Sequence, residues 1–303
     1  MKKVLLISSI VSLVSVLLCL VSCKGDDSED IPVVDDATGI GAVFPMGLPK
    51  SAVIVGNMIC DDSGRLVSCT MAYTTEIVNF DYAEDKVRIV YENILRGKYV
   101  EAHLGENGYV DNFIINKYNG AEPISVTCEY NGSGHLVGMH SQNGINRKVN
   151  DYVIKHNGKN DILWIKNYQE YTNSTLNEKK VKTYSFEYTD DNVSVPIENK
   201  SGIMLIDCIY YQGDWFNYNE THPINNRRSH YARDCFLEWI PMYYAGLLGK
   251  GSAHMPVRVN NEDTGEYVTY KWEIMPDGRP LKVREEYFLK FSEGWNNNVY
   301  RWE

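Results

Sequence analysis

The sequence predicts a mainly β fold: a long antiparallel meander that forms a curved sheet or partly open barrel, with one helical insertion near residues 232–248. Three observations support this prediction. Apolar and polar residues alternate with a period of two, turn-forming pairs recur at short intervals, and one late segment has helical spacing instead. The elements are taken below in chain order.

The first residues have the layout of a secretory signal peptide. Lys2 and Lys3 form a positive start, and Val4–Val21 is an apolar stretch without a charge. At about 18 residues the stretch also reaches the lower limit for a helix that crosses a bilayer, so an uncleaved anchor is the alternative. The sequence Leu20-Val21-Ser22-Cys23 decides against that anchor, because it fits the permissive form of the bacterial lipobox, which ends in an acylated cysteine.

We therefore predict a signal peptide over residues 1–22 and lipidation of Cys23, which anchors the chain in the outer membrane. A thiolate is nucleophilic enough to take a diacylglyceryl group as a thioether. Each buried methylene contributes about 0.8 kcal/mol, so several acyl chains hold a protein on a membrane durably. The membrane is thus an expected partner, reached through the lipid.

The acidic segment Lys24–Asp30 is too polar to pack, and it predicts a flexible tether that extends over residues 23–45. Its acids, so close to Cys23, are similar to the surface-export signal of Bacteroidetes lipoproteins. A plain spacer is the alternative. We prefer export and expect display at the cell surface.

Residues 46–303 are predicted to form a single β-rich domain, although the length also fits two small ones. The net charge of −10 repels phosphate backbones and anionic lipid heads, so nucleic acid is not an expected partner.

Five cysteines remain in this part, an odd number: Cys60, Cys69, Cys128, Cys208 and Cys235. Cys60 and Cys69 flank an Asp-Asp-Ser-Gly turn, where a disulfide across a hairpin is one interpretation. Buried free thiols that pack as small hydrophobic residues are the other. The sequence contains no CxxC motif and no Cys/His spacing typical of a metal site.

A three-residue pattern recurs at strand ends: an aromatic or small apolar residue, an acid, then tyrosine. Each copy is followed by a polar turn and by alternating aliphatic residues. Turns such as Asn131-Gly132 and Asn157-Gly158 separate the strands at intervals that suit successive hairpins. The copies are Phe80-Asp81-Tyr82 before Val87 and Ile89, Cys128-Glu129-Tyr130 before Leu136, and Phe186-Glu187-Tyr188 before Val193 and Val195.

One late segment breaks the period of two. Gly249 is a plausible C-terminal cap for the predicted helix, and Pro241 should kink or split it. A helix with this many apolar residues must be covered by other elements. We therefore expect it on the concave face of the sheet or across one end of a partly closed barrel. The apolar residues with helical spacing are Phe236, Trp239, Ile240, Tyr243 and Leu247.

The closing hairpin has the clearest pattern. Val268–Ile274 alternates strictly, Met275–Pro280 has turn chemistry, and alternation then resumes. The apolar positions of the second strand are Leu281, Val283, Tyr287 and Leu289.

Together these features resemble a Bacteroidetes lipoprotein family of a domain of unknown function, which is described as having a porin-like β fold. The resemblance would cover Val53–Glu303. It rests on the acidic tether, the tyrosine-rich meander, the segments His230–Ala232 and Tyr244–Ser252, and the hairpin with Gly278 and Pro280. It implies no catalytic residues.

The strands differ from those of an outer-membrane barrel, which show lipid an apolar face along their spanning length. We expect charges on the outward face, and the chain ends in Glu303 rather than in an aromatic residue. The likeness to porins should therefore be one of shape, in a curved water-soluble sheet. The outward charges are Asp81, Glu129, Glu187, Lys271 and Glu273.

Chemistry-bearing residues form no recognised motif. A metal site or acid/base pair near the insertion is one hypothesis, but its spacing matches no metal motif, and surface histidines in a loop are the alternative. The pairs Asp61-Asp62 and Asp190-Asp191 fit turn chemistry better than calcium binding or glycoside cleavage. We assign no catalytic residue, metal or cofactor. The residues near the insertion are His222, His230 and His254 with Asp214, Glu220 and Asp234.

The 22 tyrosines and 6 tryptophans suggest a binding role, because flat rings stack on sugars and anchor interfaces. Ordinary packing within a sheet is the alternative explanation. The candidate binding residues, which stand beside amide side chains, are Trp215, Tyr218, Trp295 and Tyr300.

The sequence thus predicts a membrane-anchored lipoprotein that acts as a non-catalytic binding or cell-envelope interaction module, with a glycan or another envelope protein as partner. The alternative is a glycan-directed hydrolase with carboxylates in a cleft near the helical insertion. A purely structural role in the envelope is a third.

Overall fold

The computed structural model describes residues 44–52, 55–71, 76–93, 97–116, 122–143, 148–172, 177–201, 236–289 and 292–302. They belong to one compact unit, Ala37–Glu303. The predicted signal peptide, Cys23 and most of the tether lie outside the described residues. No helix in the described part of the chain is long and apolar enough to cross a membrane.

The fold is mainly β, and the predicted meander is confirmed. Fifteen of the described strands form one antiparallel sheet, in which each strand pairs with the next member of that sheet along the chain. Its strands are β1 (Val55–Cys60), β2 (Leu66–Met71), β3 (Glu76–Tyr82), β4 (Lys86–Tyr91), β5 (Tyr99–Leu104), β6 (Val110–Asn116), β7 (Ile124–Tyr130), β8 (Leu136–Asn143), β9 (Lys148–His156), β10 (Ile162–Thr172), β11 (Asn177–Glu187), β14 (Arg258–Asn261), β15 (Tyr267–Ile274), β16 (Pro280–Leu289) and β17 (Ser292–Val299).

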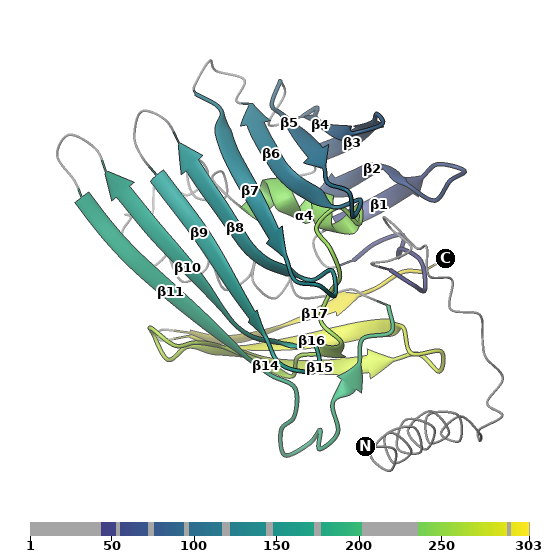
Figure 1. The fold of residues 1–303 in the computed structure, drawn as a ribbon. Helices are drawn as coiled ribbons and strands as arrows, with labels where there is room; N and C mark the ends of the chain where they lie inside the picture. Colours follow the sequence, from purple (N-terminus) through teal and green to yellow (C-terminus); the bar gives the residue numbers. More distant parts are fainter. Residues whose placement is uncertain are drawn as a thin grey trace, which may run out of the picture. The chain divides into compact units, whose positions relative to one another are not determined.

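Three further elements among the described residues, two short strands and a helix, interrupt this order between β11 and β14. A second sheet pairs β12 (Ile197–Glu198) with β13 (His254–Met255), and the helix α4 (Phe236–Tyr244) lies between them in sequence. Figure 1 shows the large sheet curving around α4, which lies on its concave side. This is one of the two positions predicted for the helix.

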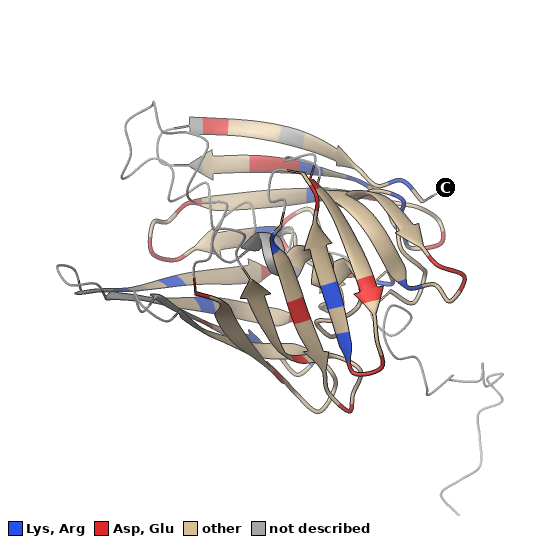
Figure 2. Ribbon diagram, turned by 90° about the horizontal axis from the view of Figure 1, so that it is seen from above, with Lys and Arg blue, Asp and Glu red and all other residues tan. Residues whose placement is uncertain are grey.

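Alternation along the strands separates a buried face from an exposed one. In β4, Val87, Ile89 and Tyr91 are buried, whereas Lys86 and Arg88 are exposed. The predicted outward charges are exposed in the same way, and Figure 2 shows basic and acidic positions interspersed along the strands and in their turns. Side chains of a strand alternate between its two faces. The buried apolar residues therefore face α4, and the charged residues face solvent.

The recurring tyrosines have a shared structural role. The hydroxyl of Tyr82 donates to the Leu66 carbonyl at 2.9 Å, and that of Tyr130 donates to the Val110 carbonyl at 2.9 Å. Tyr188 donates to the Ile162 carbonyl at 3.0 Å. In each copy the tyrosine stands at the end of a strand or just beyond it. Its hydroxyl donates to the backbone carbonyl of the first residue of the preceding strand.

The third copy departs from the prediction after its tyrosine. Residues 190–196, which include both expected aliphatic strand positions, form bends and turns rather than a strand. Asp190 explains the difference, because its carboxylate accepts the backbone N–H groups of Asn192 and Val193 at 2.8 and 2.7 Å. Those bonds favour a local turn over strand pairing.

Turn chemistry also accounts for the other paired acids. The Asp61 carboxylate accepts the backbone N–H groups of Ser63 and Arg65, at 3.0 and 2.9 Å. The amides of Asn131 and Asn157 accept equivalent bonds in the β7–β8 and β9–β10 turns. The interpretation of Asp61-Asp62 and Asp190-Asp191 as turn residues is confirmed.

The helix differs from its prediction at the C-terminal end. It runs through Pro241 without splitting and ends at Tyr244. The cap is Gly246 rather than Gly249: Gly246 has a φ of 73°, its N–H bonds the Tyr243 carbonyl, and the Leu247 N–H bonds the Met242 carbonyl. These two bonds define a Schellman motif, in which the residue with positive φ is almost always glycine or asparagine.

The thiols of the first hairpin are not bridged. Cys60, Cys69 and Cys128 are free, and Cys60 lies opposite Leu66 rather than Cys69. Cys60 is exposed, whereas Cys69 is buried, and burial raises the pKa of the Cys69 thiol to about 12. The alternative of buried free thiols therefore holds for Cys69 and Cys128, whereas Cys60 is free but exposed. Cys208 and Cys235 lie outside the described residues.

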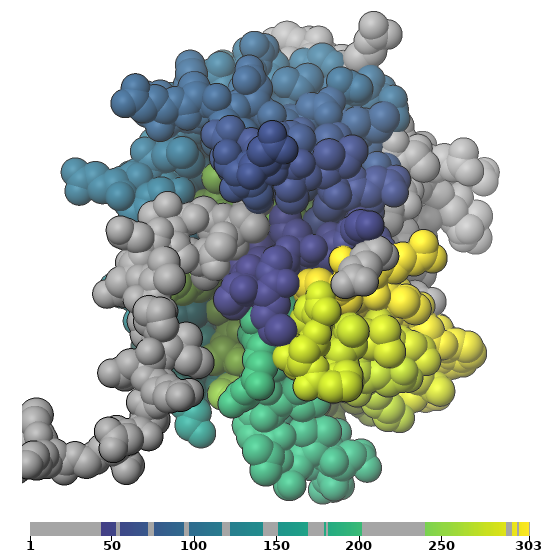
Figure 3. All heavy atoms as spheres, turned by 90° about the vertical axis from the view of Figure 1, so that its right-hand side faces the viewer, coloured from purple at the N-terminus to yellow at the C-terminus, as the bar shows by residue number. Residues whose placement is uncertain are grey.

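The segments that flank the two edge strands of the large sheet, before β1 and after β17, meet at one isolated bridge. Ser51 forms an antiparallel bridge with Arg301, through N–H to carbonyl bonds of 3.3 and 3.1 Å. Figure 3 shows the first described residues, in purple, against the yellow C-terminal strands. Along the described strands β1 and β17 do not pair, so the sheet does not close into a barrel.

Candidate functional site

The structure describes only some of the predicted site residues. Cys23, Trp215 and Tyr218 lie outside the described part of the chain. The same holds for the acids and histidines of the proposed insertion site other than His254: His222, His230, Asp214, Glu220 and Asp234. Their predicted roles therefore stay predictions.

The two remaining candidate binding residues occupy opposite environments. Trp295, on β17, is 60% exposed, whereas Tyr300, just beyond the end of β17, is 1% exposed. They differ because successive backbone positions face opposite sides of a sheet, and Trp295 faces solvent. Only Trp295 of this pair offers its ring to an external ligand.

Trp295 lies within a cluster of rings and guanidinium groups on the outer face of the C-terminal strands. The Arg284 guanidinium lies 5.1 Å from the centre of the Trp295 ring. Tyr267 and Phe288, opposite each other on β15 and β16, are stacked with their centres 4.5 Å apart. Arg258 covers Tyr267 at 3.7 Å. We call these five residues the Trp295 patch.

Ion pairs hold the patch in place. Glu286, directly opposite Trp295, accepts from Lys271 at 2.9 Å and from Arg284 at 3.1 Å. Such exposed pairs contribute little stability, typically about 0–1 kcal/mol, but they fix the guanidinium over the indole. The patch therefore offers an ordered, amphipathic surface.

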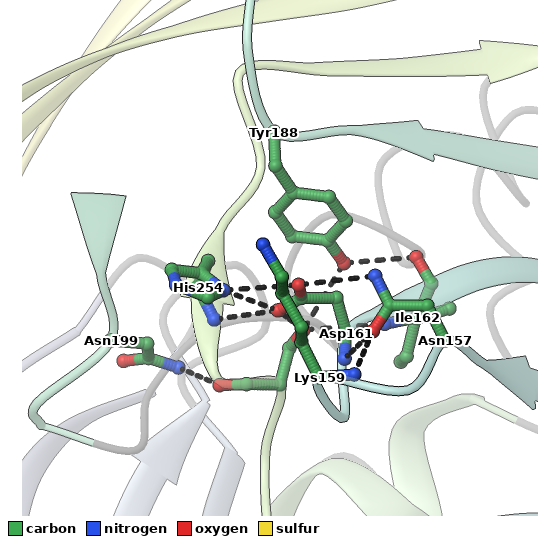
Figure 4. A network of polar contacts seen from close by, with 8 residues as sticks. Asn157, Lys159, Asp161, Ile162, Tyr188, Asn199 and His254 are labelled. Atoms are coloured by element: carbon green, nitrogen blue, oxygen red, sulfur yellow. Dashed lines mark hydrogen bonds and ion pairs between the residues drawn. The ribbon is translucent and has the colours of Figure 1, made fainter. Parts of the chain in front are cut away.

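A second polar cluster, which the sequence did not predict, surrounds Asp161 (Figure 4). Asp161 is only 3% exposed. Its carboxylate accepts from the backbone N–H of His254 at 2.9 Å and from the imidazole Nδ1 at 2.9 and 3.0 Å. Asn157 Nδ2 and Ser252 Oγ also donate to it, each at 3.3 Å. Four donor groups thus satisfy one buried carboxylate.

This cluster joins segments that are far apart in sequence. Ser252 Oγ accepts from the Ile162 N–H at 3.3 Å and lies 3.1 Å from the Tyr188 hydroxyl. Asn199 Nδ2 donates to the Ser252 carbonyl at 3.0 Å. Asp161 and Ser252 together therefore connect the β9–β10 turn, the end of β11 and the β12–β13 sheet.

The Asp161 cluster does not have the geometry of a nucleophilic triad. In such a triad the serine binds the imidazole nitrogen opposite the one that binds the aspartate. Here Ser252 binds the carboxylate itself, on the same side as His254 Nδ1. The arrangement is that of a satisfied structural carboxylate, and we interpret it as a fastening between segments.

Two further histidines lie near this cluster. The rings of His135 and His156 are 5.3 Å apart, and His135 Nδ1 lies 3.2 Å from the Lys250 carbonyl. Burial lowers the pKa of His156 to about 4, so the ring is neutral near pH 7. Within the described part of the chain, no group of three or more potential ligands is placed to hold a metal ion.

A buried acid lies on the concave face of β16. Glu285 is 2% exposed, and burial raises the pKa of its carboxyl to about 7. Tyr287 donates its hydroxyl to this carboxyl, which partly offsets the effect of burial. The alternation of β16 could have indicated an inward acid here, but nothing in the sequence gives its depth.

Comparisons with known proteins bear on the fold. No protein-family model and no curated protein matches the chain. Among solved structures, a porin-like protein from Bacteroides uniformis has a TM-score of 0.56 at 12% identity, over 81% of this chain and 89% of that chain. A porin-like protein from Bacteroides vulgatus has a TM-score of 0.49 at 12% identity, over 81% and 91%. The likeness to the first structure supports the predicted porin-like β fold.

Proposed function

We propose that this chain is a lipid-anchored protein of the outer membrane, displayed at the cell surface, whose β domain is a non-catalytic binding module for a glycan or another envelope protein. The observation that supports binding is the Trp295 patch: a tryptophan that is 60% exposed, held under a guanidinium beside a stacked aromatic pair. Exposed tryptophans with arginine neighbours are typical of the residues that dominate interfaces.

The anchor follows from the lipobox at Cys23 and from the acidic residues after it. The likeness to a porin-like protein of Bacteroides concerns the fold and is consistent with an envelope protein. A glycan-directed hydrolase with carboxylates near the helical insertion is the alternative. The acids predicted near the insertion, Asp214, Glu220 and Asp234, lie outside the described part of the chain.

The test is photo-crosslinking in living cells with the full chain. A benzophenone amino acid replaces Trp295 in one strain, and replaces Tyr168 in a control strain. Tyr168 is a matched site, since it is an exposed aromatic residue on the outer face of β10, 39% exposed and outside the patch. We expect a covalent glycan or protein adduct from position 295 and none from position 168.

Absence of any adduct at position 295, in cells where the chain reaches the outer membrane, would overturn the binding role. Equal adducts at the two positions would show non-specific contact and would contradict the assignment of the Trp295 patch.

A further inference from the structure

We propose that the open edge of β17 receives an extended segment of another envelope protein, which adds to the sheet as one more antiparallel strand. This inference rests on the proposed binding function and names its partner class and mode. It starts from the Ser51–Arg301 bridge, which occupies only one position of that edge.

The direction of each backbone group on β17 follows from the hydrogen bonds at its C-terminal end. The Tyr300 N–H donates to the Leu281 carbonyl of β16 at 2.9 Å, whereas Arg301 exchanges bonds with Ser51 on the other side. Successive residues of an antiparallel strand direct their N–H and C=O groups to opposite sides. The residues whose backbone groups face the open edge are therefore Glu293, Trp295, Asn297 and Val299.

These four positions have no strand beside them among the described residues. The chain turns away immediately after Ser51, because the Ala52 N–H bonds the Val55 carbonyl at 2.7 Å. From there β1 runs beside Lys50 rather than beside β17, as the bond of 3.0 Å from the Met58 N–H to the Lys50 carbonyl shows. Within the part of the chain that the structure describes, no strand pairs with the outer edge of Glu293–Val299, so this edge is open to an added strand.

The edge carries little of the usual protection against added strands. Natural edge strands are blunted by charged side chains, especially lysine, by proline, by bulges, by very short length or by a covering segment. Glu293 is the one charged residue among the four positions that face this edge. The eight residues of β17, Ser-Glu-Gly-Trp-Asn-Asn-Asn-Val, contain neither proline nor lysine, and their pairing with β16 has no register shift. The other edge strand, β1, has two register shifts and a positive φ at Asn57, so it is a poor template.

The side chains beside the open edge fit an apolar partner residue. Trp295 and Val299 are 60% and 51% exposed and face the outer side of the sheet. A strand added at 4.7–4.9 Å, the usual spacing, would place every second side chain next to them. Main-chain bonds would then supply affinity, and Trp295 would select an apolar side chain.

Charge favours a partner protein over a second copy of this chain. The net charge of −10 opposes the approach of two copies, and exposed Glu293 has no ion-pair partner in the described part of the chain. The fitting segment alternates apolar residues with polar ones and has a basic residue opposite Glu293. A glycan has no regular row of N–H and C=O groups to pair with a strand edge, so glycan binding at Trp295 is a competing outcome.

The experiment combines the crosslinker at position 295 with two substitutions at Asn297. Asn297→Pro removes an N–H that faces the open edge and leaves the bonds to β16, whereas Asn297→Ala keeps that N–H. Proline is tolerated on an edge strand in this orientation. We expect protein adducts to fall at least tenfold in Asn297→Pro and to change less than twofold in Asn297→Ala.

The crosslinked segment, identified by mass spectrometry and synthesised, is then added to the purified full chain in detergent. Hydrogen exchange should slow at the amides of Glu293, Trp295, Asn297 and Val299. Adducts unaffected by Asn297→Pro, glycan adducts alone, or a concentration-dependent dimer that Asn297→Pro abolishes would each overturn this inference and leave the proposed function standing. Absence of all adducts would overturn the proposed function as well.

Discussion

Asp161 and His254 are joined twice: the carboxylate accepts both the backbone N–H and the imidazole Nδ1 of His254, at 2.9 Å each, across 93 residues of sequence. The carboxylate is buried. Its donors lie in the β9–β10 turn, on β13 and in the segment just before β13 rather than on a long strand of the large sheet. This pair positions the β12–β13 sheet against the β9–β10 turn.

Replacing Asp161 should therefore destabilise the domain. Asp161→Asn keeps the size of the side chain but loses the charge-assisted bonds, and we expect the free energy of unfolding to fall by about 3 kcal/mol. Urea denaturation measures the change, with the exposed acid replaced in Asp191→Ala as the control. A double-mutant cycle with His254→Ala should show coupling of about 1–3 kcal/mol; additive effects would contradict the pairing.

Stability should depend on pH through Glu285. Its pKa is raised from 4.5 to about 7 in the folded chain, so the folded state binds the proton more tightly than the unfolded state. The stabilisation is therefore complete below pH 4.5 and is lost as the pH rises through about 7. The loss amounts to about 3 kcal/mol, at about 1.4 kcal/mol for each pKa unit.

The measurement is urea denaturation of the wild type and of Glu285→Gln between pH 4 and pH 8. Because glutamine does not titrate, the variant should lose this part of the pH dependence. Parallel pH profiles of the two proteins would show that Glu285 does not titrate in this range.

Gly249 should be intolerant of a side chain. Its φ is 79°, and an added Cβ would lie 2.5 Å from the Gly134 carbonyl oxygen. Gly265 is a matched control, since its φ is 74° and nothing lies within 4 Å of its added Cβ. We expect Gly265→Ala to lower the free energy of unfolding by only about 1–2 kcal/mol, the strain of a positive φ in alanine. Gly249→Ala should lower it by about 1–3 kcal/mol more, because the backbone around the added Cβ must move. Equal melting temperatures for the two variants would contradict the close approach.

Anchoring should depend on Cys23 alone among the first cysteines. Cys23→Ala removes the predicted acyl acceptor, so the chain should be released or mislocalised, absent from the outer-membrane fraction, while its circular dichroism keeps the β signal. Cys19→Ala, within the predicted signal peptide, should stay in the membrane fraction. Membrane retention of Cys23→Ala would show that another element anchors the chain.

The sequence by itself determined the meander, because alternation and turn chemistry are local. Val268–Ile274 has a period of two whatever its partners are, and Asp61 or Asn157 selects a turn through bonds to residues within four positions. The local pattern predicted the C-terminal end of the helix less well, because two glycines near that end could each serve as the cap. Gly246 is the cap because it is the glycine two positions after the last helical residue.

Only the tertiary structure decided which residues meet. Asp161 and His254 are brought together by the pairing of strands that are distant in sequence. No local sequence pattern indicates how deeply a carboxylate is buried. Trp295 and Tyr300 look alike in sequence, yet strand register exposes one ring and buries the other. The open edge of β17 likewise exists because the sheet curves far enough to bring Ser51 to Arg301 but not far enough to pair β1 with β17, and that curvature is a sum over fifteen strands.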